Sequence, residues 1–167
     1  MKRHLCFLLC VSVLLCLLGC AKDEPDVPVE FFYLQNGFSY DTHQSVIGSE
    51  VRETAGVHGY TRILDLYLKG PKSNTLSPTF PEDSRIISLS QGPSSVSLVL
   101  SDAFASLAGI ELSIACICLA KTVIHLTGCT AVTIQAESLL LDGEKSITLD
   151  NSGVLLYDNY YGQTKSK

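Results

Sequence analysis

The chain has 167 residues, a hydrophobic content of 46% and a formal net charge of −5 at pH 7. This length corresponds to one ordinary domain. An acidic surface does not attract nucleic acid or anionic lipid headgroups, so we expect neither to be a partner.

The chain begins with a predicted export signal. Two basic residues are followed by an apolar run of 14 residues, Leu5–Leu18. That run is short for a membrane span, which needs roughly 20 apolar residues, and its length is typical of a secretory signal. The sequence Leu17-Leu18-Gly19-Cys20 resembles the bacterial lipobox. The resemblance implies cleavage after Gly19 and a diacylglycerol group on Cys20.

The lipoprotein interpretation divides the chain into four parts. Residues 1–19 are the signal peptide, 20–28 the lipid anchor and linker, 29–157 the domain and 158–167 a disordered tail. The mature chain then has ten cations against seventeen acidic residues, a net charge of −7, so we expect acyl chains to hold it at the extracytoplasmic face of the cell membrane. The alternative is an ordinary secretory signal in which Cys20 is incidental, because other cysteines occur in the same segment: Cys6, Cys10 and Cys16.

The first part of the domain predicts strands followed by a helix. Val29–Leu34 is rich in β-branched and aromatic residues and precedes an Asn-Gly turn signal, which predicts a strand. Ser45–Glu53 is predicted to lie extended beside it. Over Tyr60–Leu68 apolar residues recur at spacings of three and four, which predicts an amphipathic helix. A Gly-Pro pair, Gly70-Pro71, marks the end of that helix.

The next segment predicts a β-hairpin. Two alternating runs, Ile87–Leu89 and Val96–Leu100, flank the turn Gln91–Ser94. Alternation predicts one buried face and one polar face. The polar face is predicted to carry serines: Ser88, Ser90, Ser97 and Ser101. Serines in this pattern indicate a solvated sheet face rather than nucleophiles.

Phe104–Leu126 is the longest apolar segment of the mature chain. Glu111, Lys121 and His125 interrupt it, and each would be costly in lipid, so we predict the core helix of a soluble domain. One apolar stripe at helical spacing is its core face: Ala108, Leu112, Ala115, Cys116, Leu119, Val123 and Leu126.

A second stripe on this helix is the candidate interface. It consists of Ile110, Ile114, Ile117 and Ile124 and lies on roughly the opposite side. A helix on one sheet needs only one apolar face, so this stripe either packs on the first helix or the C-terminal segment, or binds another protein.

The predicted fold is α+β. Gly128 ends the long helix, Ala131–Ala136 predicts a strand, and residues 139–141 and 147–149 predict an appended small hairpin. The order β-α-β-β-α-β predicts a two-layer sandwich with both helices on one face of a mixed or antiparallel sheet.

The sequence contains no recognisable catalytic motif. The mature histidines, His43, His58 and His125, are scattered, so we expect no enzyme, no cofactor and no small-molecule substrate. Cys116, Cys118 and Cys129 are an odd set in one region and indicate buried free thiols. The spacing of Cys118, His125 and Cys129 leaves a metal site as an alternative, although no fourth ligand is evident. A ligand-binding or hydrolytic lipoprotein, with a pocket near His58 or Asp102, is the alternative function.

Several segments resemble one family. Gly70-Pro71, Pro81–Leu89 and Val96–Ser101, with Gly128–Ile134, are similar to the GerMN domain of sporulation and germination lipoproteins, over about residues 29–143. The resemblance implies a fold like the ring-building modules of secretion-type complexes, and no assigned catalytic residues. It also implies an assembly role with protein partners or by self-association. The family carries tandem copies, whereas this chain has room for one.

Overall fold

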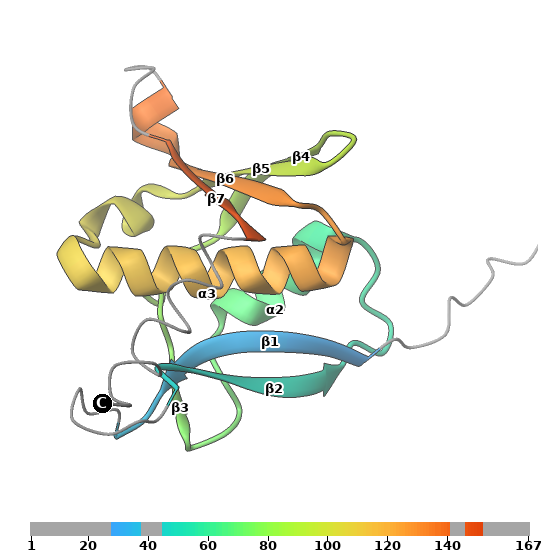
Figure 1. Ribbon diagram of the computed structural model, residues 1–167, viewed down its shortest axis with the longest axis vertical. Helices are drawn as coiled ribbons and strands as arrows, with labels where there is room; N and C mark the ends of the chain where they lie inside the picture. The colour runs from blue at the N-terminus through green and yellow to red at the C-terminus, as the bar shows by residue number, and fades with distance from the viewer. Residues whose placement is uncertain (1–27, 38–44, 141–145, 152–167) are drawn as a thin grey trace, which may run out of the picture.

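The computed structural model describes residues 28–37, 45–140 and 146–151. The predicted signal, Cys20, most of the linker, His43 and the tail 158–167 lie outside the described residues, so these predictions stay predictions. The described chain confirms the α+β class. Two sheets lie on opposite sides of the long helix α3 (Gly109–Thr127), as Figure 1 shows.

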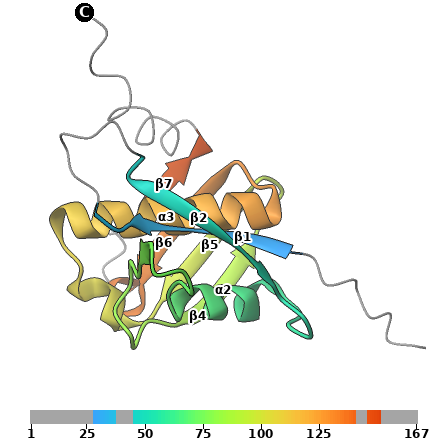
Figure 2. The ribbon, with the colours of Figure 1, turned by 90° about the horizontal axis from the view of Figure 1, so that it is seen from below.

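The larger sheet has four strands in the order β4-β5-β6-β7. Its strands are β4 (Ile86–Gln91), β5 (Ser95–Leu100), β6 (Ala131–Ala136) and β7 (Ile147–Asp150). β5 and β6 are parallel and the outer pairs antiparallel, so the predicted mixed sheet is confirmed. Figure 2 shows α2 (Tyr60–Leu68) beside β4 and α3 beside β6 and β7. Both helices therefore cover one face of this sheet.

The smaller sheet has three strands in the order β2-β1-β3. They are β1 (Pro28–Gln35), β2 (Ile47–Glu53) and β3 (Leu76–Ser77), all paired antiparallel. The predicted strands at 29–34 and 45–53 therefore pair with each other. They do not join the hairpin in one sheet, but lie across α3 from it (Figure 1). The second sheet adds a layer that the sequence pattern did not predict.

The middle of α3 explains the second sheet. All six residues of Ala115–Ala120 are buried, so the helix is enclosed nearly all round at this level. A helix that is apolar on every side has to be covered on every side. Within the described ranges α3 is also the one helix long and apolar enough to span a membrane, but here it packs between two sheets. Gly128 ends the helix as predicted, and it does so in the left-handed conformation, with φ 71°.

α3 also protects an open edge of β1. β1 pairs with β3 only at its last two residues, which leaves most of that edge without a strand. Thr122 lies there, and its Oγ1 accepts a hydrogen bond from the Phe32 N–H (3.1 Å). Covering an edge with a helix removes a site of unwanted strand pairing.

Three details of the strands differ from prediction. A bulge between Ile86 and Ser88 turns Ile87 outward, where it is 39% exposed, while Ile86 takes the buried position. Ser101 is buried rather than exposed, because its hydroxyl accepts from the Arg85 N–H and donates to the Asp83 carbonyl (both 3.2 Å). Residues 137–140 form a 3-10 helix (η2) instead of a hairpin strand, and β7 pairs with β6.

Candidate interaction surface

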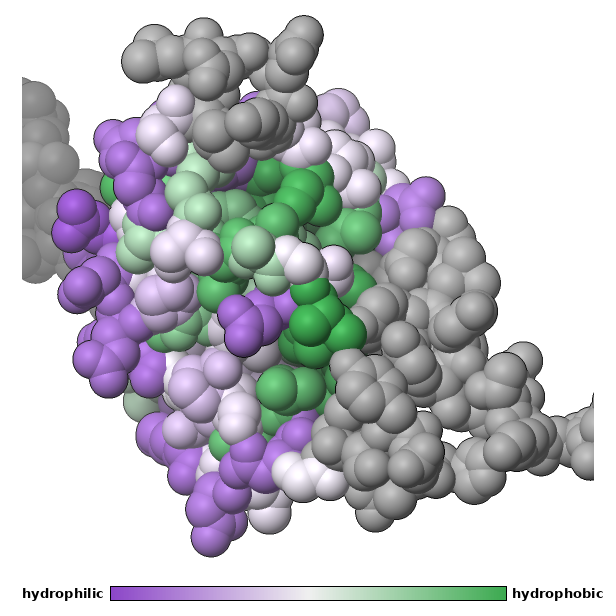
Figure 3. Space-filling view, turned by 90° about the vertical axis from the view of Figure 1, so that its left-hand side faces the viewer, coloured by the Kyte–Doolittle hydropathy of each residue, from purple (hydrophilic) through white to green (hydrophobic). Residues whose placement is uncertain are grey.

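Partly exposed apolar residues lie along the outer side of α3 and on β7, the strand that packs against this helix. We call them the α3–β7 surface, which is defined by five residues: Ile110, Ile114, Ile124, Ile147 and Leu149. Ile110 is 47% exposed, and the other four are half-buried against the core. Figure 3 shows hydrophobic side chains gathered on the side of the molecule where α3 begins. The surface therefore runs from an open amino-terminal end to a more covered carboxyl-terminal end.

The four predicted interface residues occupy unequal positions. Ile117 is only 6% exposed and belongs to the core, so its predicted place on an open surface is corrected. It is buried because the middle of α3 is enclosed. Ile114 and Ile124 are half-buried, and Ile110 is the most exposed of the four. For these three residues the interface stays a prediction.

β7 contributes residues that the sequence reasoning missed. Ile147 pairs with Ile134, and Leu149 with Val132, and both partners point into the core. Residues paired across neighbouring strands lie on the same face of a sheet, so Ile147 and Leu149 face α3. The alternation of Ile147 and Leu149 with polar residues was a usable signal, but it was assigned to a separate hairpin.

Polar groups border this surface on the side of β1. The Lys121 Nζ lies 4.8 Å from the centre of the Phe32 ring, a cation–π distance. The His125 Nε2 lies 3.6 Å from Glu30 Oε2. These contacts tie the outer side of α3 to β1.

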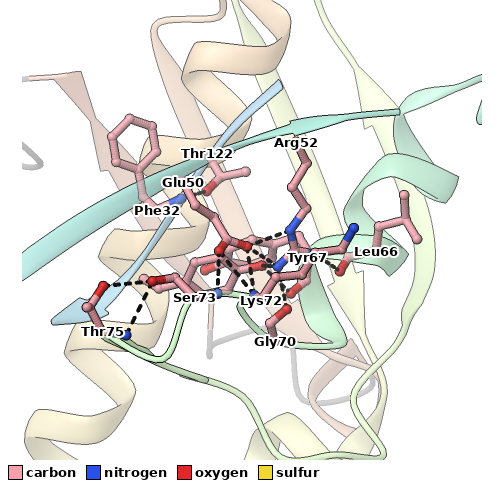
Figure 4. A network of polar contacts seen from close by, with 11 residues as sticks. Phe32, Glu50, Arg52, Leu66, Tyr67, Gly70, Lys72, Ser73, Thr75 and Thr122 are labelled. Carbon is pink, nitrogen blue, oxygen red and sulfur yellow. Dashed lines mark hydrogen bonds and ion pairs between the residues drawn. The ribbon is translucent and has the colours of Figure 1, made fainter. Parts of the chain in front are cut away.

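The densest polar cluster of the described chain lies elsewhere, at the end of α2 (Figure 4). Arg52 Nη1 donates to the Leu66 carbonyl (3.1 Å), and Nη2 donates to the Gly70 carbonyl (2.5 Å). Its Nε donates to Glu50 Oε1 (2.5 Å). Arg52 thus binds one carbonyl group in the last turn of α2 and one just beyond its end, where a helix leaves carbonyl groups unpaired.

Glu50 holds the chain that follows this helix. Its carboxylate accepts hydrogen bonds from the backbone N–H groups of Lys72 (3.0 Å) and Ser73 (2.9 Å). Burial alone would raise the pKa of Glu50, but these N–H groups and the Arg52 guanidinium outweigh it and lower the pKa. The carboxylate therefore stays ionised. We call Arg52 and Glu50 the α2 clamp.

The α2 clamp continues into an aromatic stack. Arg52 Nη2 donates to the Tyr33 hydroxyl (3.2 Å), which donates to the Tyr67 carbonyl (2.9 Å). The two rings stack at 4.8 Å. Burial raises the pKa of both tyrosines, so both hydroxyls stay neutral. Every group in this chain of contacts has a partner inside the domain, and the arrangement fixes α2 and β2 rather than forming a reactive site.

The residues that the sequence analysis considered for a catalytic or metal site either make hydrogen bonds that stabilise the fold or lie too far apart to act together. Asp102 Oδ1 accepts from the Ser138 N–H (2.7 Å), which caps η2. His58 is exposed in the segment before α2. Cys118 and Cys129 are buried, whereas His125 is turned toward Glu30. Among the described residues, no three His, Cys, Asp or Glu side chains lie close enough to hold a metal ion.

Comparison with solved structures shows a fold similar to the tandem GerMN domains of the sporulation protein GerM from Bacillus subtilis. The TM-score is 0.52 at 17% sequence identity, over 71% of this chain and 42% of that chain, so this chain spans less than half of that protein. A predicted lipoprotein from Clostridium perfringens matches with a TM-score of 0.39 at 18% identity, over 71% of this chain and 80% of that chain. No protein-family model and no curated protein sequence matches the chain. The resemblance to a GerMN domain is confirmed for the fold.

Proposed function

We propose that this protein is a lipid-anchored, extracytoplasmic and non-enzymatic module that helps assemble an envelope complex of the sporulation or germination type. The observation that carries the proposal is the α3–β7 surface, with Ile110 open at one end of an otherwise half-buried apolar strip. Apolar areas of this kind on a soluble domain favour binding of another protein. The likeness of the fold to GerMN domains supports the same direction.

The mechanism we propose is association confined to a membrane surface. A lipid on Cys20 would restrict the domain to two dimensions and raise its local concentration near envelope partners. An apolar surface on α3 then needs only modest affinity to hold a neighbour. The acidic character of the chain suits this arrangement, because the lipid and not surface charge provides the membrane attachment.

The anchor is tested by metabolic labelling of cells with a fatty acid that carries a detectable tag. We expect the wild-type protein to take up the label and to sediment with membranes. We expect Cys20→Ser to remain unlabelled and to keep residues 1–19. Cys16→Ser is the matched control, because it removes a cysteine outside the lipobox. Labelling of Cys20→Ser equal to that of the wild type would refute the lipid anchor.

The interaction surface is tested by substituting one exposed residue on each side of the molecule. Ile110→Glu puts a charge on the α3–β7 surface, and Val51→Glu puts one on the smaller sheet, where Val51 is 66% exposed. Chemical crosslinking in membranes should lose its products with Ile110→Glu, by about tenfold, and keep them with Val51→Glu. Unchanged products in a folded Ile110→Glu protein would remove the interface from the proposal.

A further inference from the structure

The described domain ends beside the carboxyl end of α3. Asp150 of β7 pairs with Ala131, and the Asn151 N–H donates to the Thr130 carbonyl (3.2 Å). Thr130 lies two residues beyond Gly128, which caps α3. The chain therefore leaves the domain near the Ile124 end of the α3–β7 surface.

The sequence that follows is apolar where it first leaves the domain. Gly153–Tyr161 contains one charged residue, Asp158, and six large apolar or aromatic residues: Val154, Leu155, Leu156, Tyr157, Tyr160 and Tyr161. The last six residues, Gly162–Lys167, are polar apart from the glycine. Solvated chain ends have few large apolar residues, so the composition of Gly153–Tyr161 favours a packed position.

The lengths of the segment and of the surface match. Ile124 and Ile114 are ten residues apart on one helix, about 15 Å at 1.5 Å per residue. Ten residues after the exit point span about 15 Å as a helix and about 33 Å as an extended chain. Residues 152–161 are thus long enough to cover the Ile124 to Ile114 part of the surface in either conformation.

We propose that residues 153–161 pack on the α3–β7 surface of their own chain and cover it between Ile124 and Ile114. The segment is covalently attached to the surface, because Leu149 lies only four residues before Gly153. This attachment gives the segment an effective concentration in the millimolar range at the surface, which favours its binding over that of a second copy of the chain. Ile110 lies beyond the covered part and stays open as the place where a partner first makes contact. The packing of residues 153–161 on this surface does not depend on the proposed function. Only the idea that the segment competes with a protein partner rests on that function.

The experiment places a benzophenone amino acid at position 114 of the full-length protein in membranes, with position 51 as the matched control. We expect light to give a crosslink within the monomer, mapped by fragment-ion mass spectrometry to residues 153–161. Position 51 should give none to that segment. Products found only in dimers, or confined to β7 at residues 147–150, would overturn the proposal.

A pair of tail variants separates the cover from the partner. Leu155→Asp with Leu156→Asp should lower the crosslink to 153–161 by about tenfold, because two apolar contacts are replaced by charges. Gln163→Asp with Thr164→Asp adds the same charges beyond the apolar run and should leave the crosslink unchanged. Equal loss in both variants, or loss in neither, contradicts the cover. Failure of Ile110→Glu to affect partner capture, with this crosslink intact, refutes only the proposed function.

Discussion

The two helices of this domain are held in place by different kinds of contact. α3 has 19 residues and is buried on nearly every side through its middle, between two sheets. α2 has nine residues, buries one face, and has its carboxyl end fixed by the α2 clamp. The comparison indicates that α3 is stabilised mainly by burial of its side chains. The position of the carboxyl end of α2 is instead fixed by a few hydrogen bonds.

The largest effect is expected from a cavity in α3. Leu119 is fully buried, so Leu119→Ala should lower the free energy of unfolding by about 3 to 4 kcal/mol. Urea denaturation measures it. Ile110→Ala, on the same helix but exposed, should cost less than about 0.5 kcal/mol. Similar losses in the two variants would mean that α3 is not enclosed as described.

The next effect is expected from the α2 clamp. Arg52→Ala removes the side-chain donor of the Leu66 and Gly70 carbonyls and leaves the Glu50 carboxylate with only the Lys72 and Ser73 N–H groups, so it should cost about 2 to 3 kcal/mol. Arg52→Lys should recover little, because an ammonium group cannot reach several acceptors in a plane. Hydrogen exchange should quicken at residues 66–73 before it does in α3. Arg62→Ala, exposed on α2, is the control, and an equal loss there would contradict the clamp.

A smaller effect is expected where α3 covers the edge of β1. Thr122→Val keeps the shape of the side chain but removes the acceptor for the buried Phe32 N–H, at a cost of about 1 to 2 kcal/mol. Thermal unfolding measures the loss. Ser113→Ala, at an exposed position of the same helix where the hydroxyl donates to the Gly109 carbonyl, is the comparison. If its Tm falls as far as that of Thr122→Val, the hydrogen bond between Thr122 and the edge of β1 contributes no more to stability than the hydroxyl of the comparison residue.

The smallest effect is a dependence on pH that involves only the α2 clamp. The pKa of Glu50 is lower in the folded state than in the unfolded state. Its contribution is therefore fully present above its unfolded pKa and is lost as pH falls through its folded pKa. Glu50→Gln should cost about 1 kcal/mol at pH 7 and less at pH 3, measured by urea denaturation. A constant difference between wild type and variant at both pH values would contradict an ionised Glu50.

Local patterns in the sequence predicted the individual elements well. The strand at 29–34, the helix at 60–68 and the strand at 131–136 each follow from residue spacing and flanking glycines, and each is present. What the spacing could not predict was which strands share a sheet. The pairing of β1 with β2 was expected from their order along the chain, but their separation from the hairpin was not, because a helix that is apolar on two sides leaves open what covers the second side.

The α2 clamp was missed for a related reason. Glu50 and Arg52 alternate with small or apolar residues in a strand, a pattern that looks solvated in sequence. In the structure they contact the end of a helix and the chain after it, 14 to 23 residues further along, and only tertiary contact reveals that role. Ile117 differs in the opposite way. The sequence placed it in a stripe that could bind a partner, but in the structure it is buried in the core. Ile110, at the start of α3, is the most exposed of the four residues of that stripe.

The three described cysteines bear on how this domain would respond to an oxidising environment. Cys116, Cys118 and Cys129 are all buried and unbridged, and burial raises the pKa of Cys116 to about 12. A thiol that is kept protonated and away from solvent reacts slowly with oxidants and with other disulfides. The described part of the domain therefore does not depend on a disulfide among these three residues, and burial would slow oxidation of the Cys116 thiol.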